Sequence, residues 1–338
     1  MDVRLSPEQV ALVDSVRRAV AEHGPRTVAG LEDPARAARL DAVVERAGWR
    51  ELRATGGDGG PWASGVEVAL VVQELARGPA DTALLGPTLA AELRRRAGAP
   101  AAEEPETVLL SGDLAGISTG RPGAAPVAVD AHRATRALAV APAERGWALT
   151  CSPLGPVRAT VDLTRPTAEV VGPATAVAGG GVALGDEDLS CVGALGRAIT
   201  CADLVGAMQG ATSLAVGYVA ERHQYGRPVG SFQAVQHLLA DAHVLTEGSR
   251  SAALHAAWAV DALPAPDAVA ATAVAKAYAA RAARDVCEAS IQAHGGIGNT
   301  WECMAHVYLR RALLSIDMFG GVDPSLALVL EHHGIGAG

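Results

Sequence analysis

The stretch from Gln292 to Glu302 combines residue types that can hold an anionic group. Before it, charged and amide side chains recur at three- and four-residue steps and small apolar residues fill the opposite side, which predicts an amphipathic helix. Gly295 and Gly296 are predicted to end this helix, and a second helix is predicted from Trp301 onward. Backbone amides at such a corner, beside the Gln292 side chain, can bind a diphosphate.

A second motif runs from Glu221 to Gln233 and contains Arg222, Tyr225 and Gly226. A guanidinium such as that of Arg222 suits phosphate oxygens. Each motif alone is weak, because a glycine pair commonly does no more than end a helix and a solvated arginine is common at a helix end. Their occurrence in one chain, in this order, is more specific.

Together the two motifs resemble the paired motifs of the acyl-CoA dehydrogenase family in residue types and in relative position. The resemblance is strong over residues 191–321, fair over 1–100 and poor between. It implies an α+β fold with an N-terminal helical domain, a reduced middle β domain and a C-terminal helical bundle.

The resemblance also implies FAD as cofactor and α,β-dehydrogenation of an acyl-CoA thioester, with an electron-transfer flavoprotein as a candidate electron acceptor. In this family each FAD lies across two subunits, so that one chain holds the flavin ring and its neighbour contributes to the adenosine diphosphate half. Gln224 stands where the family usually has a small hydroxyl residue, and Phe232 would border the adenine. The cofactor-binding residues implied here are Arg222, Gln224, Phe232, Gln292, Gly295 and Gly296.

The catalytic carboxylate of the family has no counterpart at either usual position. One position follows the segment Arg310 to Ala312 and is occupied by Phe319, and the other falls near Gly196. Neither residue can accept the C2 proton, which requires a carboxylate base within reach.

Three acidic residues are candidate substitutes for this base, and none of them is well placed by sequence. Glu247 has the spacing of a surface charge, Glu302 lies just past the glycine corner, and Asp317 is two residues from the expected position. Arg197 matches a position that lies near substrate in some relatives, but a charge at the start of a helix is the simpler interpretation.

The patterning predicts how these residues are positioned. Residues 1–104 are predicted to be helical, with capping boxes at Ser6 and Ser64 and a fourth helix from Asp81 to Arg96 that is interrupted around Gly86. Residues 105–190 predict about five short strands. Residues 191–338 return to long helices, one of them capped by Ser231 and ending at Pro264.

The middle region departs from the family. We find no Thr-Glu-Pro-type loop, and Trp147, the one tryptophan of this region, lacks the flanking pattern of the family's flavin-contacting strand. Flavin-ring binding by this chain is therefore not expected from its own middle domain.

Composition excludes several function classes. A formal charge of -9 without a long basic run argues against nucleic acid as a partner, and the apolar runs are too interrupted for a predicted membrane span. The five cysteines lack a Cys-x-x-Cys pair, and His332-His333 has no partners at metal-ligand spacing, so we expect buried thiols, no metal site and a cytoplasmic protein.

The motifs that would contact a neighbour's FAD are retained, whereas the base and the features that would hold the flavin ring are missing. The sequence therefore predicts one subunit of an α2β2 heterotetramer, whose homologous partner carries the glutamate base and whose FAD site this chain completes. Two alternatives stay open: a self-sufficient flavoenzyme with a displaced base, and a binding scaffold without redox work.

Overall fold

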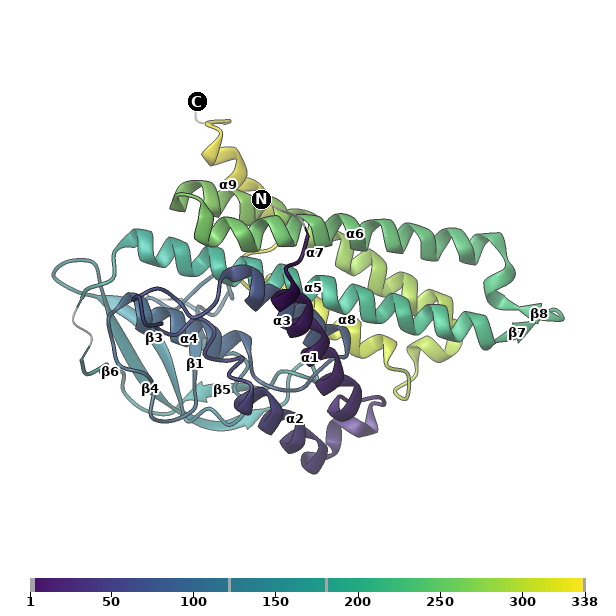
Figure 1. Cartoon of the computed structure of the whole chain (residues 1–338), viewed down its shortest axis with the longest axis horizontal. Helices are drawn as coiled ribbons and strands as arrows, with labels where there is room; N and C mark the ends of the chain where they lie inside the picture. The colour runs from purple at the N-terminus through teal and green to yellow at the C-terminus, as the bar shows by residue number, and fades with distance from the viewer. Residues whose placement is uncertain (1–3, 121–122, 180–181, 337–338) are drawn as a thin grey trace.

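Helices occupy both ends of the chain and strands its middle, as the computed structural model shows for residues 4–120, 123–179 and 182–336 (Figure 1). This arrangement confirms the predicted fold class. The strands of the middle region lie between residues 106 and 176, and a short hairpin follows at residues 223–228. The domain boundaries at 104 and 190 stay predictions.

The N-terminal helices begin where the sequence provides caps. Ser6 and Ser64 both form capping boxes, with Gln9 and Glu67 as their reciprocal partners. The elements of this part are α1 (Pro7–His23), a 3₁₀ turn (Ala29–Glu32), α2 (Pro34–Arg46), α3 (Gly65–Arg77) and α4 (Leu85–Arg96).

The expected start of the fourth helix at Asp81 was wrong. Helix α4 begins at Leu85, because the carboxylate of Asp130 accepts hydrogen bonds from the backbone N–H groups of Leu84 (2.7 Å) and Gly86 (3.2 Å). Pro87 then lies in the first turn, where a helix needs no N–H donor. The Gly86–Pro87 pair therefore belongs to the start of the helix and does not interrupt it.

The strands of the middle region form one small sheet that closes on itself. Their order is β3-β1-β2-β5-β4-β6, and β3 also pairs with β4, so that five strands make a ring of pairings. All pairings are antiparallel except that of β1 with β3. The strands are β1 (Glu106–Leu110), β2 (Val127–Ala128), β3 (Arg136–Pro142), β4 (Trp147–Arg158), β5 (Thr167–Val170) and β6 (Thr175–Ala176). The described part of the middle region thus holds six strands where about five were expected.

Long helices make up the C-terminal part, and the hairpin at residues 223–228 lies at the end of the molecule opposite the sheet (Figure 1). Ser231 does not cap α6 as expected, because Phe232 takes the cap position. The Ser231 hydroxyl donates to the carbonyl of Pro228 (2.7 Å). The second motif helix also starts later than expected, at Ala305. The elements are α5 (Asp186–Glu221), β7 (His223–Gln224), β8 (Arg227–Pro228), a 3₁₀ turn (Val229–Ser231), α6 (Gln233–Ala262), α7 (Ala265–His294), a 3₁₀ turn (Gly295–Asn299), α8 (Ala305–Asp317) and α9 (Val322–His332).

Two helical stretches are apolar and long enough to cross a membrane by length and composition alone. In Asp186–Glu221 the most apolar window is 89% buried inside the protein, as expected of a core helix. The other stretch, Ala305–His332, is interrupted between α8 and α9. Such helices are weak evidence for a membrane span.

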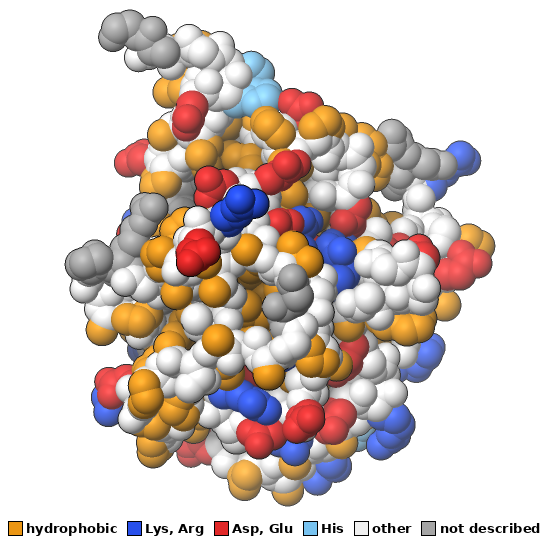
Figure 2. All heavy atoms as spheres, turned by 90° about the vertical axis from the view of Figure 1, so that its left-hand side faces the viewer, with side chains coloured by type: hydrophobic (Ala, Val, Ile, Leu, Met, Phe, Trp, Pro, Cys, Tyr) orange, Lys and Arg blue, Asp and Glu red, His pale blue; other side chains and the backbone are white. Residues whose placement is uncertain are grey.

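The end of the molecule that carries the sheet has a mixed surface. Figure 2 shows hydrophobic, basic and acidic side chains interspersed over this face, without a broad area of one charge. A nucleic-acid-binding face would be expected to concentrate positive charge.

Glu92 is a buried carboxylate surrounded by arginines. Its carboxylate is 1% exposed and accepts hydrogen bonds from Arg53 (3.2 Å), Arg95 (2.7 Å) and Arg96 (2.7 Å). Burial alone would raise the pKa of Glu92, but the hydrogen bond from Arg95 and the charges of these arginines outweigh it and lower the pKa to about 2.

We therefore expect Glu92→Gln to flatten the acid limb of the stability curve. A lowered folded-state pKa contributes stability above the ordinary value of 4.5 that is lost as the pH falls toward 2. Without this carboxylate, the slope of the unfolding free energy against pH should decrease by up to about 1.4 kcal/mol per pH unit. Urea denaturation at a series of acidic pH values measures the slope, and an unchanged slope would contradict the role of Glu92.

Candidate functional site

A groove of about 760 Å³ lies where α5 ends, α6 begins and α7 ends. It brings the two sequence motifs together although seventy positions separate Arg222 from Gln292. Of the six residues predicted to bind the cofactor, five line this groove: Arg222, Gln224, Gln292, Gly295 and Gly296.

The glycine side of the groove is an open stretch of backbone. Gly295 has a φ of +63°, which ends α7 and favours glycine. Among the described residues, and apart from the local backbone, no atom lies within 4 Å of the point where a side chain would begin at Gly295 or at Gly296. A ligand can therefore approach this backbone closely, next to the exposed side chain of Gln292.

The arginine side of the groove is held by a tight hairpin. Tyr225 and Gly226, with φ values of +53° and +77°, form the turn between β7 and β8. Arg222 ends α5, and its backbone N–H and C=O are both used, by Tyr218 (2.9 Å) and Val229 (2.7 Å). Its exposed guanidinium makes no ion pair with any described residue, so it is available to an anion.

Phe232 does not line the groove. The guanidinium carbon of Arg227 lies over its ring, 4.0 Å from the ring centroid. The ring of Tyr225 packs edge-on against it, with centroids 6.2 Å apart. Its proposed contact with an adenine stays a prediction.

Two aromatic residues of the groove were missed by sequence reasoning. The ring of His294 stacks on that of Tyr218 with centroids 4.6 Å apart, and its Nδ1 atom lies 2.7 Å from the carbonyl oxygen of Ser290. Both rings line the groove. His294 stands inside the glycine motif, and Tyr218 lies one helical turn before Arg222, so their spacing was a usable signal.

Gly196 and Phe319, the two positions that the resemblance assigns to the catalytic carboxylate, face each other, and the space between them is filled. Phe319 is 1% exposed, and its backbone N–H donates to the carbonyl of Leu114 (2.8 Å). A Cβ atom on Gly196 would lie 2.5 to 2.6 Å from three atoms of the Phe319 ring. Neither residue has a side chain that can accept a proton, and the assignment of these two positions to the base stays a prediction.

The groove and the base positions are far apart. Gly196 and Arg222 stand 26 positions apart on one continuous helix, α5. At 1.5 Å per residue this corresponds to roughly 39 Å. A ligand bound in the groove is therefore too far from residues 196 and 319 of the same chain to react there.

Comparison with known proteins identifies the family. The family model described as the C-terminal domain of acyl-CoA dehydrogenase matches residues 194–326. The chain is also 31% identical over 280 residues to the acyl-CoA dehydrogenase IpdE2 of Mycolicibacterium smegmatis, and the match covers 78% of this chain and 77% of that protein. The chain belongs to the acyl-CoA dehydrogenase family. Membership supports an oxidoreductase role.

Solved structures share the acyl-CoA dehydrogenase fold over nearly the whole chain. A Tcur3481–Tcur3483 steroid acyl-CoA dehydrogenase variant aligns with a TM-score of 0.78 at 23% identity, covering 98% of both chains. The ChsE4–ChsE5 complex from Mycobacterium tuberculosis aligns with a TM-score of 0.76 at 22% identity, covering 99% of both. PigA with FAD and proline also has a TM-score of 0.76, at 17% identity, covering 99% of this chain and 100% of that one. At identities below 25%, these similarities show a shared fold and no more.

None of the three acids considered as a substitute base lies in the groove of this acyl-CoA dehydrogenase chain. Glu247 is on α6 and pairs with Arg250 at 3.5 Å, Glu302 is exposed beyond the glycine corner, and Asp317 is exposed at the end of α8. No acidic residue of the described chain lines the groove.

The expectation that Arg197 is a charge at a helix start was wrong. Helix α5 begins at Asp186, so Arg197 lies several turns inside it and is only 8% exposed. Lys276 of α7 is fully buried nearby, and its ammonium donates to the hydroxyl of Thr200 (2.9 Å) and to two backbone carbonyls. Burial lowers the pKa of Lys276 to about 8. Nothing in the alanine-rich sequence around Lys276 indicated this position.

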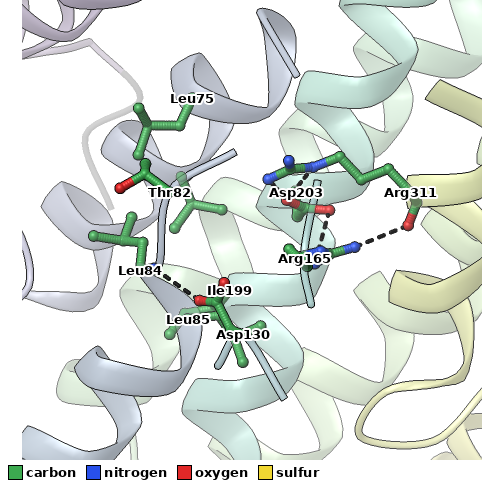
Figure 3. Close-up of a pocket in the computed structure, with 10 residues that line it drawn as sticks. Leu75, Thr82, Leu84, Leu85, Asp130, Arg165, Ile199, Asp203 and Arg311 are labelled. Atoms are coloured by element: carbon green, nitrogen blue, oxygen red, sulfur yellow. Dashed lines mark hydrogen bonds and ion pairs between the residues drawn. The ribbon is translucent and has the colours of Figure 1, made fainter. Parts of the chain in front are cut away.

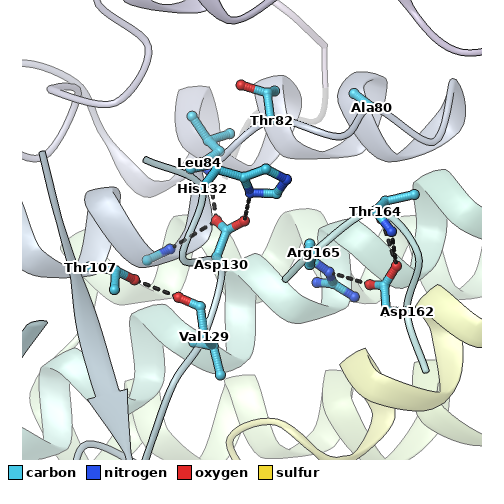
Figure 4. Close-up of polar contacts among 12 residues, drawn as sticks. Ala80, Thr82, Leu84, Thr107, Val129, Asp130, His132, Asp162, Thr164 and Arg165 are labelled. Carbon is cyan, nitrogen blue, oxygen red and sulfur yellow. Dashed lines mark hydrogen bonds and ion pairs between the residues drawn. The ribbon is translucent and has the colours of Figure 1, made fainter. Parts of the chain in front are cut away.

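A buried ionic cluster surrounds an internal cavity of about 20 Å³, a space for water rather than for a cofactor (Figure 3). Asp203 accepts from Arg311 (2.7 and 3.0 Å) and lies 3.4 Å from Arg165. Asp130 also lines the cavity and accepts from the backbone at the start of α4, and Asp162, next to the cavity lining, accepts from Arg165 (Figure 4). The cluster connects α5, α8 and the strand region.

Gly196→Ala is expected to lower the unfolding free energy by about 1–3 kcal/mol, since the added methyl group would overlap the buried ring of Phe319. Gly217→Ala is the matched control, because Gly217 lies on the same helix with nothing within 4 Å of its missing side chain. This control should stabilise the protein by roughly 0.5–1 kcal/mol. Urea denaturation compares the two variants, and equal effects would disprove the contact.

Proposed function

We propose that this chain is one subunit of a heteromeric, FAD-dependent acyl-CoA dehydrogenase and that it completes the FAD site of a homologous partner. The observation that carries the proposal is the contrast between its two sites. The nucleotide-type groove is intact and open, whereas the base positions are occupied by Phe319 and Gly196 and lie roughly 39 Å away along α5.

The groove residues fit the adenosine diphosphate half of FAD. Arg222 offers a guanidinium without an ion-pair partner among the described residues, and Gly295 and Gly296 offer approachable backbone. Gln292 and Gln224 add amide groups, and no described acid repels a phosphate there. In such an enzyme FAD supplies the hydride acceptor.

This chain's own contribution would be binding and orientation. Its groove is open to solvent, so it encloses only part of a bound dinucleotide, and a partner must cover the flavin ring. The C2 proton of the acyl thioester would be removed by a carboxylate of that partner, because the chain has none at the two family positions.

Relatives support the heteromeric assembly and the substrate class. The ChsE4–ChsE5 structure is a complex, and the Tcur3481–Tcur3483 protein is a steroid acyl-CoA dehydrogenase. We extend to this chain an α2β2 assembly, an acyl-CoA substrate of the steroid-degradation type, a cytoplasmic location and an electron-transfer flavoprotein as acceptor.

Co-expression with a family member that carries the glutamate tests the proposal. The expected product is an α2β2 particle that retains one FAD per heterodimer, measured from flavin absorbance against protein mass. The chain purified alone should be colourless and inactive. A flavin-loaded, active assembly of this chain alone would overturn the proposal.

The partner's glutamate provides a matched pair of variants. Glu→Gln in the partner should abolish acyl-CoA-dependent bleaching of the flavin while leaving the flavin content unchanged. Asp317→Asn in this chain removes the acid nearest to the usual base position and should leave bleaching intact. Loss of bleaching in Asp317→Asn would favour a displaced base within this chain.

A further inference from the structure

Arg197 is a buried cation without a counter-ion. It is 8% exposed, and no carboxylate of the described residues lies within 4 Å of it. Arginine is rarely buried to this extent unless it is paired, because removing its charge from water is costly. Burial lowers the pKa of Arg197 to about 10, which leaves it charged at neutral pH.

The guanidinium of Arg197 is held from one side and free on the other. Its Nε atom donates to the hydroxyl of Thr272 on α7 at 3.2 Å. Its Nη1 and Nη2 atoms have no hydrogen-bond partner in the described part of the chain, and both lie 3.9 Å from the point where a side chain of Gly193 would begin. The two donors of the fork therefore point back along α5, over a residue that has no side chain to cover them.

The neighbours of Arg197 add positive charge and supply none of the missing negative charge. The fully buried Lys276 lies close enough for the charge of Arg197 to help lower its pKa. Lys276 is satisfied by oxygen atoms of Thr200, Ser315 and Met318. Burial raises the pKa of the adjacent Cys201 thiol to about 11, so this thiol is neutral at neutral pH.

We propose that the Arg197 guanidinium, approached over Gly193, binds a carboxylate that comes from outside this chain. A carboxylate can accept both Nη hydrogens in the two-pronged geometry that arginine favours. The carboxylate belongs either to a small ligand or to a side chain of the partner subunit. The site lies near the filled base positions and is independent of the FAD groove.

Acetate is the probe for this site, and thermal denaturation of the chain alone is the measurement. Acetate should raise the midpoint of the wild-type chain by several degrees at saturation, compared with chloride at equal ionic strength. Arg197→Gln should not respond to acetate beyond its response to chloride. A wild-type chain that responds equally to both salts would overturn the proposal.

Gly193 allows a second test that does not depend on how well Arg197→Gln folds. Gly193→Glu places a carboxylate one helical turn before Arg197, where it can occupy the site from within the chain. Gly193→Gln has nearly the same size and helix propensity but no charge. The Glu variant should have the higher midpoint and should lose the acetate response, whereas the Gln variant should keep a response. Equal midpoints and equal responses would contradict the site.

The source of the carboxylate is decided in the assembled particle. If the acetate response of the free chain disappears on assembly with the partner, a partner side chain occupies the site. If the response persists in the particle, the site serves a free carboxylate ligand. Either result leaves the acetate response of the free chain as the test of the site itself, whether or not the proposed FAD-sharing assembly is correct.

Discussion

Arg222→Ala is expected to weaken FAD binding by the assembled particle roughly 10- to 100-fold. Arg222 is the one cation among the residues that line the groove, and a hydrogen bond to a charged group contributes about 1.5–3 kcal/mol. Titration of the flavin-free particle with FAD, followed by flavin fluorescence, measures the change. Assembly itself should be unaffected, which size-exclusion chromatography can show.

Arg18→Ala is the control for the Arg222 variant. Arg18 is also exposed, lies on α1 and makes no ion pair with a described residue. Its replacement removes the same net charge and should leave FAD affinity unchanged. If both variants weaken binding equally, the effect comes from overall charge. If neither variant weakens FAD binding, Arg222 does not contact FAD in the groove.

Asp203→Asn is expected to lower the unfolding free energy by about 3–5 kcal/mol, since it breaks a buried ion cluster and leaves Arg311 and Arg165 without their shared acceptor. Burial raises the pKa of Asp203, but the charges of the two arginines outweigh it and hold the pKa below its usual range. The contribution is therefore present at neutral pH and is lost in acid. Urea denaturation at neutral pH measures it.

The exposed ion pair of Arg158 with Glu169 provides the matched control. Its atoms are 2.8 Å apart, but the two side chains are 66% and 63% exposed. Arg158→Ala should therefore change the unfolding free energy by about 1 kcal/mol or less. An Asp203→Asn variant as stable as Arg158→Ala would mean that the buried cluster contributes little.

Much of the fold could be predicted from local patterns. Capping residues such as Ser6 and Ser64 act within a few positions, so the helix starts they mark were correct. The start of α4 was misplaced because its determinant, Asp130, lies more than forty positions away in sequence. Ser231 is not the cap because α6 begins at Gln233, with Phe232 in the cap position, and Ser231 belongs to the preceding 3₁₀ turn.

The candidate site also has features that local sequence patterns predict and features that depend on long-range packing. Arg222 and Gln292 belong to two motifs that a sequence shows directly, and the structure places both in one groove. By contrast, the contact between Gly196 and Phe319 and the burial of Arg197 depend on how distant segments pack. A residue type alone does not reveal such packing, so Arg197 was mistaken for a charge at the start of a helix.

Helix α5 joins the groove to the filled base positions as one uninterrupted rod. Under the proposed assembly, its two ends work in different active centres, so damage at one end spares the other. After a gene duplication, one copy could then accumulate changes at residues 196 and 319 without harming the nucleotide end, provided that its sister kept the acid. If each copy lost a different part of the site, neither could work without the other, and both would be retained.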